Sequence, residues 1–193
     1  MIVPVPTPQE NAGRSGVYRL LGRLWLQEVD TLLLNQLGRG DLGAAFENAG
    51  GVVPTLVTGE TVEDLAVDFC QLFLGPSQHC PPYQSVWETG QFEGEAGNSM
   101  LGFAEVVRYD PSEVLPGGML DHLGLQLDLM GHLLGGSIAG ETQIVEEVAN
   151  AFYSAHLSWP EPLLVAAQER ARTAFYRSLL KLTGEFLETE ARS

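Results

Sequence analysis

The fold is decided by residues 68–87, which read DFCQLFLGPSQHCPPYQSVW. Leu65, Phe69 and the Leu-Phe pair that follows recur at helical spacing, which predicts the end of an amphipathic helix. Gly75 and Pro76 then end the helix, because glycine accepts a positive φ at little cost and proline cannot continue a helix. The residues that follow are irregular yet apolar. Two interpretations stay open for them: a loop buried over the core, or a binding surface.

Helical patterns extend outward from this stretch in both directions. Helices are expected over residues 14–28, 31–37, 41–49, 61–74, 95–109, 119–134, 141–157 and 162–188. Sustained alternation of period two and internal repeats are both missing from the sequence. The sequence therefore predicts an all-α protein, a single-domain bundle of seven to nine helices. Residues 1–12, which are rich in proline, are expected to form a flexible tail, and residues 13–193 the helical domain.

Composition limits the class of protein. The chain has 193 residues, of which 45% are hydrophobic and 18% charged, as in a globular domain. It contains neither an apolar run long enough to span a membrane nor a secretory signal at its N-terminus. We therefore expect a cytoplasmic protein without an integral membrane segment, in which Cys70 and Cys80 are reduced thiols.

The charge is strongly negative and unevenly distributed. The formal net charge is −15, and nineteen acidic residues but only one basic residue, Arg108, lie between Gly40 and Glu169. Such a surface repels nucleic acid and anionic membranes, which excludes nucleic acid as a partner, and it attracts cations. A cationic partner and simple solubility both remain explanations of this charge.

Dedicated catalytic and metal-binding motifs are missing from the sequence. Asp128 and His132 have the spacing of a ligand pair, and Cys70, His79 and Cys80 could form a cluster, but neither set matches a known metal motif. Nucleophile elbows and phosphate loops are also missing, and Cys70 is expected to pack as a small core residue. The sequence thus predicts a protein that is not an enzyme, with no catalytic residue, metal or cofactor.

The predicted helix at residues 119–134 carries one polar pair of interest. Asp121 and His122 follow the break at Gly117 and Gly118, so they are expected in the first turn of this helix. An aspartate there is favoured by the helix dipole, and a histidine there is biased towards its neutral form. The pair is either a helix-start aspartate with a surface histidine or part of a functional site.

Four motifs in order carry a resemblance to a known family. They are DFxxLFxGP followed by PPYxSVW, the Asp121-His122 pair, FxxxHLxWP from Phe152 to Pro160, and FYRxLxxLT from Phe175 to Thr183. Together they resemble the redox-enzyme maturation chaperones of the TorD/DmsD/NarJ type over about residues 14–187. These are cytoplasmic, all-helical proteins that bind twin-arginine signal peptides, or other parts, of molybdenum enzymes.

The resemblance implies a non-catalytic function. The partner would be a molybdenum-cofactor oxidoreductase subunit or its twin-arginine signal peptide, held until the cofactor is in place and the enzyme is exported or docks at the membrane. The peptide-binding residues would be Pro82, Tyr83, Trp87, Gly97, Ser99, Asp121 and His122. A nucleotide-binding or hydrolysing enzyme is the alternative. The resemblance leaves open which molybdoenzyme is bound and whether dimers form by exchange of helices.

Overall fold

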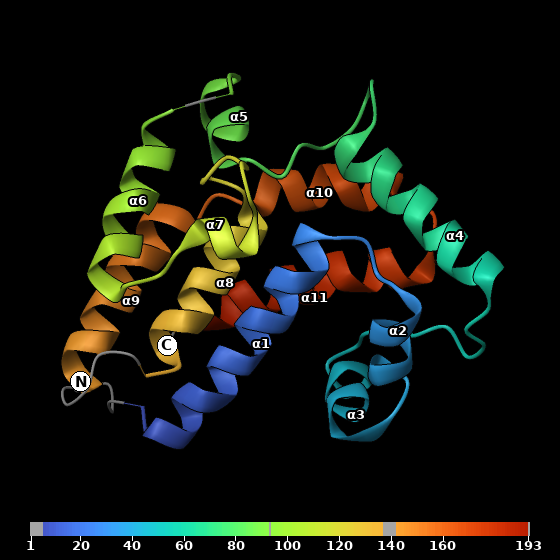
Figure 1. Ribbon diagram of the computed structural model, residues 1–193, viewed down its shortest axis with the longest axis horizontal. Helices are drawn as coiled ribbons and strands as arrows, with labels where there is room; N and C mark the ends of the chain where they lie inside the picture. Colours follow the sequence, from blue (N-terminus) through green and yellow to red (C-terminus); the bar gives the residue numbers. More distant parts are fainter. Residues whose placement is uncertain (1–5, 93, 137–141, 193) are drawn as a thin grey trace. The chain divides into compact units, whose positions relative to one another are not determined.

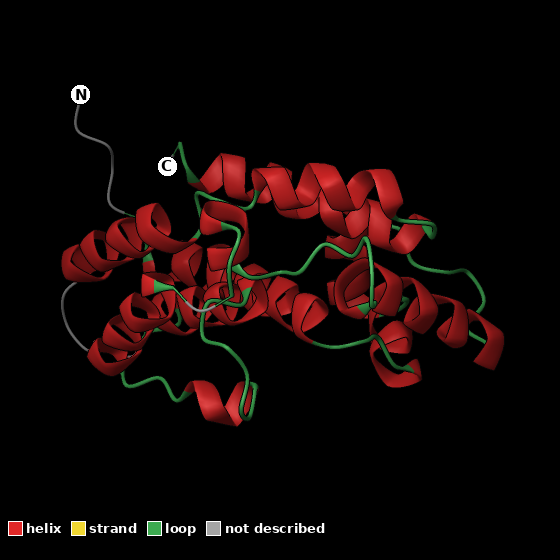
Figure 2. Cartoon of the chain, turned by 90° about the horizontal axis from the view of Figure 1, so that it is seen from above, coloured by secondary structure: helices red, strands yellow, loops and turns green. Residues whose placement is uncertain are grey.

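The computed structural model describes residues 6–92, 94–136 and 142–192 (Figure 1). In these residues it contains eleven α-helices and one π-helical segment. Helices and loops make up this part of the chain (Figure 2), and its only β-type pairing is the isolated bridge between Tyr83 and His122. The predicted all-α class is confirmed. The helix count exceeds seven to nine because the short helices α5 (Gln84–Thr89) and α7 (Pro111–Val114) lie in segments that read as irregular, and because one predicted helix is divided.

The chain divides into two compact units, both helical. The first unit, unit 1, contains the chain up to Leu26, the segment Pro82–Pro160 and the last residues from Ala191. The second, unit 2, contains Gln27–Pro81 and Glu161–Glu190. In the residues that the structure describes, no helix is long and apolar enough to cross a membrane.

Unit 1 is built around α8 (Leu123–Leu134), which is buried on nearly all sides. This helix packs against α1 (Pro8–Leu26), α6 (Glu95–Val107) and α9 (Thr142–His156) (Figure 1). Glycine permits the close approach of α1, because a Cβ atom on Gly22 would lie 3.0 Å from the backbone oxygen of Gly124. Ten of its twelve residues are buried, as expected for a helix in the interior of a unit.

Unit 2 gathers the aromatic residues of the opening stretch. It contains α2 (Thr31–Leu37), α3 (Gly40–Asn48), α4 (Gly59–Phe69), the π-helical segment Cys70–Leu74, α10 (Glu161–Arg170) and α11 (Ala174–Glu190). Phe69 and Phe73 pack edge to face, with ring centroids 5.2 Å apart, and both contact Tyr176 of α11. Phe69 and Phe73, the aromatic residues of the opening motif, therefore pack in the core of unit 2 against α11.

Asp68 explains why the last helix is divided. Its side chain is only 2% exposed, and its carboxylate accepts hydrogen bonds from the backbone N–H of Thr173 at 2.8 Å and from the Thr173 hydroxyl at 2.7 Å. The backbone N–H of Arg172 lies 3.2 Å away. The single helix predicted over residues 162–188 is therefore wrong: the helix ends at Arg170, and Asp68, from a distant part of the sequence, binds the two residues that lead into α11.

The N-terminal boundary also differs from the prediction. Helix α1 begins at Pro8, so residues 8–12 of the predicted tail are helical. Thr7 and Glu10 form a reciprocal cap, in which Glu10 accepts from the backbone N–H of Thr7 at 2.6 Å and Thr7 accepts from that of Glu10 at 3.3 Å. Residues 1–5 of the predicted tail and Glu141, the predicted start of α9, lie outside the described residues.

The two cysteines lie in different environments. Both are free thiols; Cys80 is buried and Cys70 is exposed. The expectation that Cys70 packs in the core is wrong: its side chain is exposed, at the point where α4 passes into the π-helical segment. Burial raises the pKa of the Cys80 thiol, and the neighbouring Arg170 opposes this shift.

Candidate functional site

Four predicted site residues meet at a backbone bridge in unit 1. Tyr83 and His122 form the isolated antiparallel bridge. On either side of it, the Leu123 N–H donates to the carbonyl of Pro82 at 2.8 Å and the Gln84 N–H donates to the carbonyl of Asp121 at 3.1 Å. The bridge joins the start of α5 to the start of α8, so Pro82, Tyr83, Asp121 and His122 are brought together.

Asp121 is turned towards the backbone rather than towards solvent. It is 2% exposed, and its carboxylate accepts a hydrogen bond from the Ser85 N–H at 2.9 Å, in the first turn of α5. The placement of Asp121 in the first turn of its own helix is wrong, because α8 begins only at Leu123. Its carboxylate instead caps a neighbouring helix and fixes the loop that carries Tyr83.

His122 is a buried helix cap. Its Nδ1 accepts a hydrogen bond from the Gly124 N–H at 2.9 Å, so this nitrogen carries no proton. The ring packs edge to face on Tyr83, with centroids 5.1 Å apart. Burial lowers the pKa of His122 to about 4, against a smaller opposing effect of Asp121. The interpretation of His122 as a surface histidine is therefore wrong.

The accessible part of the site is aromatic. Tyr83 and Trp87 are half-buried, and Tyr83 packs on Phe92, with ring centroids 5.7 Å apart. Phe92 is 54% exposed, although sequence reasoning did not select it. In the sequence, Phe92 could have been noticed only as a single aromatic residue five positions after Trp87, in a segment of otherwise small and polar residues. An exposed aromatic ring next to half-buried ones forms an apolar surface of the kind that binds a partner.

Gly97 and Ser99 lie in the first turns of α6, which contacts α5. Gly97 is half-buried and Ser99 exposed, and the Ser99 hydroxyl lies 2.9 Å from His156 Nε2. The structure links Ser99 to the bridge through His156 and Gln84. For Gly97, the link to the bridge residues is the contact between α6, on which it lies, and α5.

A buried hydrogen-bond network underlies the site, and sequence reasoning did not find it as a unit. The side-chain amide of Gln84 donates to the Ala155 carbonyl at 2.8 Å, while its oxygen accepts from Gln126 at 2.8 Å and from His156 Nδ1 at 3.0 Å. Gln126 in turn accepts from the indole N–H of Trp159 at 2.9 Å. Gln84, His156 and Trp159 lie within the motifs quoted above, but the motifs give no sign that these side chains meet.

The network fixes the proton on His156. An amide oxygen only accepts, so Nδ1 donates to Gln84, and Nε2 is then the acceptor for the Ser99 hydroxyl. His156 is 1% exposed, and burial lowers its pKa to about 4. Burial therefore favours the neutral imidazole, the form in which Nε2 accepts from the Ser99 hydroxyl.

We expect acid to destabilise unit 1 through these histidines. A histidine whose pKa is about 4 when folded and near 6.5 when unfolded binds fewer protons in the folded state, so its stabilisation is complete above pH 6.5 and is lost as the pH falls towards 4. His156→Gln should reduce the fall in the free energy of unfolding between pH 7 and pH 4 by about 2 kcal/mol, after allowance for local relaxation.

Urea unfolding at several pH values measures this difference. His79→Gln in unit 2 is the matched control, because it removes an imidazole that is only half-buried. An unchanged pH dependence in His156→Gln would contradict the proposed neutral state of the ring.

The residues suggested as metal ligands have other partners. Asp128 accepts from the Tyr109 hydroxyl at 2.8 Å, and burial, followed by the charge of Asp128, raises the Tyr109 pKa. His132 Nε2 is hydrogen-bonded to the Val107 carbonyl oxygen at 3.1 Å. Throughout residues 6–92, 94–136 and 142–192, no three histidine, cysteine or acidic residues are grouped so that they could hold a metal ion.

Comparison with known proteins places this geometry in context. The sequence model of the nitrate reductase delta subunit family matches residues 41–164. Chaperone protein TorD of Shewanella sp. (strain ANA-3) is 28% identical over 191 residues, which cover 90% of this chain and 90% of that protein. Chaperone protein TorD of Vibrio vulnificus (strain CMCP6) is 33% identical over 131 residues, which cover 64% of this chain and 60% of that protein.

The fold has a counterpart among solved structures. The crystal structure of a proposed redox enzyme maturation protein from Archaeoglobus fulgidus aligns with a TM-score of 0.54 and covers 92% of this chain and 93% of that one. Its sequence identity is 16%, so the likeness concerns the fold alone. It agrees with the all-helical architecture described above.

Proposed function

The chain belongs to the nitrate reductase delta subunit family, that of the TorD-like redox-enzyme maturation chaperones, and on this premise we propose that it binds a molybdoenzyme subunit before the enzyme is complete. The ligand is the twin-arginine leader or the apo-form of the subunit, held in the cytoplasm while the cofactor is inserted and before export or membrane docking. The chaperone names of the curated relatives support a non-catalytic role.

One observation carries the proposal for the site: the half-buried rings of Tyr83 and Trp87 lie on the same short segment as the exposed Phe92. A leader peptide offers an apolar segment, and an aromatic surface of this kind can receive it. Pro82, Asp121 and His122 give the surface its shape, since they hold the bridge and cap the helices on either side.

The charged part of a leader needs exposed carboxylates, and Asp121 is buried. Glu88 and Glu95 are exposed, on α5 and in the first turn of α6, beside the loop residues. Carboxylates pair with guanidinium groups through two parallel hydrogen bonds, which lysine cannot reproduce. We assign the two arginines of the leader to Glu88 and Glu95, with Gly97 and Ser99 lining the α6 side.

Titration of a fluorescent twin-arginine peptide tests these roles. Trp87→Ala should weaken binding about tenfold at every salt concentration, because it removes apolar contact area. Glu88→Gln with Glu95→Gln should weaken binding about fivefold at low salt, and this loss should vanish at high salt as exposed ion pairs are screened. Replacing both peptide arginines by lysine should reproduce the effect of the glutamine variants.

Two controls separate binding from stability. Glu105→Gln with Glu113→Gln removes the same charge from exposed positions of α6 and α7 and should leave peptide binding unchanged. Asp121→Asn should lower the melting temperature, since it weakens a buried cap. If Trp87→Ala and the charge variants showed the same salt dependence in folded protein, the assignment of apolar and ionic roles would be wrong.

A further inference from the structure

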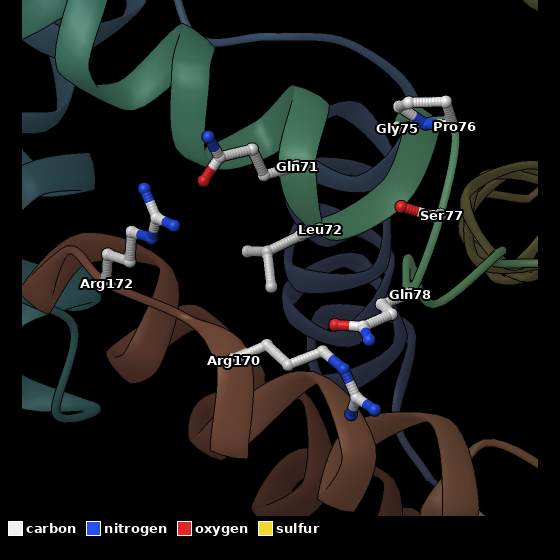
Figure 3. A pocket seen from close by; sticks show the side chains of 8 residues that line it. All are labelled: Gln71, Leu72, Gly75, Pro76, Ser77, Gln78, Arg170 and Arg172. Carbon is white, nitrogen blue, oxygen red and sulfur yellow. The ribbon is translucent and has the colours of Figure 1, made fainter.

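Unit 2 contains a pocket that the proposed leader site does not use. It has a volume of about 370 Å³ and lies between the end of the opening motif and the turn that joins α10 to α11 (Figure 3). It is lined by Gln71, Leu72, Gly75, Pro76, Ser77, Gln78, Arg170 and Arg172. The volume is within the range of pockets that hold small ligands or short peptide segments.

The charge of this pocket is opposite to that of the protein. The chain carries a net charge of −15, but the two charged residues that line the pocket are both arginines and no carboxylate lines it. Figure 3 shows Arg172 extending towards Gln71 at one end and Arg170 towards Gln78 at the other, with Leu72 between them. The pocket thus presents two cationic ends separated by an apolar floor.

The guanidinium groups have donors to spare. Arg170 donates one N–H to the Ala166 carbonyl at 2.6 Å and also interacts with the Cys80 thiol, so part of its set of five donors stays available. Arg172 is exposed, and among the described residues only its backbone N–H, not its side chain, is hydrogen-bonded. Both side chains can therefore pair with an incoming anion.

The loop that closes the pocket is held in an uncommon conformation. Gln78 has a φ of 58°, in the left-handed region that residues other than glycine seldom adopt. Such a conformation persists only where its surroundings impose it, and it is often found at sites with a function. Here it accompanies a side chain that lines the pocket, where it can hydrogen-bond a ligand.

We propose that this pocket binds an acidic segment of a polypeptide, with carboxylates at Arg170 and Arg172 and backbone groups at Gln71, Ser77 and Gln78. A phosphate group fits less well, because phosphate sites use free backbone N–H groups at a helix start. The corresponding groups of Arg172 and Thr173 are already bonded to Asp68. Two separate carboxylates can instead reach the two guanidinium groups from the solvent side.

This site goes beyond the proposed function, because it recognises the opposite charge and lies in the other unit. A polypeptide partner could be bound through a cationic leader at unit 1 and through an acidic segment at unit 2. The two affinities are measurable separately on the same full-length protein.

Fluorescence anisotropy with a labelled eight-residue peptide of alternating glutamate and leucine tests the proposal. Arg170→Gln with Arg172→Gln should weaken binding about fivefold at low salt, the effect of losing two exposed ion pairs. Arg39→Gln with Lys181→Gln removes the same charge from exposed positions of unit 2 outside the pocket and should change binding less than about twofold. If Arg170→Gln prevents folding, Arg172→Gln alone serves as the test, because the Arg172 side chain is exposed and its replacement should not affect folding.

Each result decides the proposal. A second peptide, in which glutamine replaces every glutamate, is the uncharged control and should not bind. The proposal is supported if, in addition, only the pocket variants bind the acidic peptide more weakly and inorganic phosphate does not compete with it. No binding of the acidic peptide, or equal losses in the pocket and control variants, would overturn it. Competition by phosphate at equimolar concentration would assign the pocket to a phosphate ligand instead. Twin-arginine peptide binding should be unchanged in the pocket variants, so a failure here is distinguishable from a failure at the leader site.

Discussion

Asp68→Ala is expected to lower the free energy of unfolding by about 4 kcal/mol, because a buried carboxylate that accepts several hydrogen bonds at a helix start is lost. The backbone N–H and the hydroxyl of Thr173 would lose an acceptor at 2.8 and 2.7 Å, and the site is closed to water. The start of α11 should loosen first, since Thr173 comes directly before this helix.

Chemical unfolding together with hydrogen exchange of the first turn of α11 measures this effect. Asp68→Asn retains an acceptor without the charge and should show about half of the loss, as expected for weaker neutral hydrogen bonds. Asp64→Ala, at an exposed position one turn earlier on α4, is the control and should cost under about 1 kcal/mol. Equal losses at Asp64 and Asp68 would refute the cap.

Gln84→Ala is expected to destabilise the protein by about 3 kcal/mol, because three buried groups lose their partner at once. The Gln126 amide, His156 Nδ1 and the Ala155 carbonyl all bond this one side chain. The substitution leaves these polar groups buried, which costs more than the loss of the bonds alone. The indole of Trp159 should also reorient, since its acceptor Gln126 is held by Gln84.

Urea unfolding gives the size of this effect, and near-ultraviolet circular dichroism reports the environment of Trp159. Gln91→Ala, at an exposed position just after α5, is the matched control and should leave both signals unchanged. A folded Gln84→Ala protein of normal stability would show that the network contributes nothing.

Local features of the fold were predictable from sequence. The expected helix over residues 31–37 is α2; it is capped by Asp30, whose carboxylate accepts from the Leu33 N–H at 2.7 Å, and glycine follows it at residue 38. Such features depend on neighbours within a few residues, so spacing and residue type suffice to find them.

Long-range contacts were not predictable. Asp68 and Thr173 are 105 residues apart, and Gln84 and His156 are 72 residues apart. Asp68 of α4 bonds the residue before α11, and Asp121, which precedes α8, caps α5; periodicity says nothing about such pairings. Of the seven site residues, the structure brings Pro82, Tyr83, Asp121 and His122 together at the bridge, but the sequence gave no indication that Asp121 and His122 are buried.

The division of unit 2 into two chain segments has a consequence during protein synthesis. Of the two segments of unit 2, residues 27–81 leave the ribosome first. Helices α10 and α11, which complete the unit, follow only after the whole segment Pro82–Pro160. Until then the apolar face that includes Phe69 and Leu72 lacks the helix that covers Phe69, and the carboxylate of Asp68 lacks its donors. A nascent chain that stalls near Pro160 would therefore expose an adhesive surface, the condition in which folding intermediates aggregate.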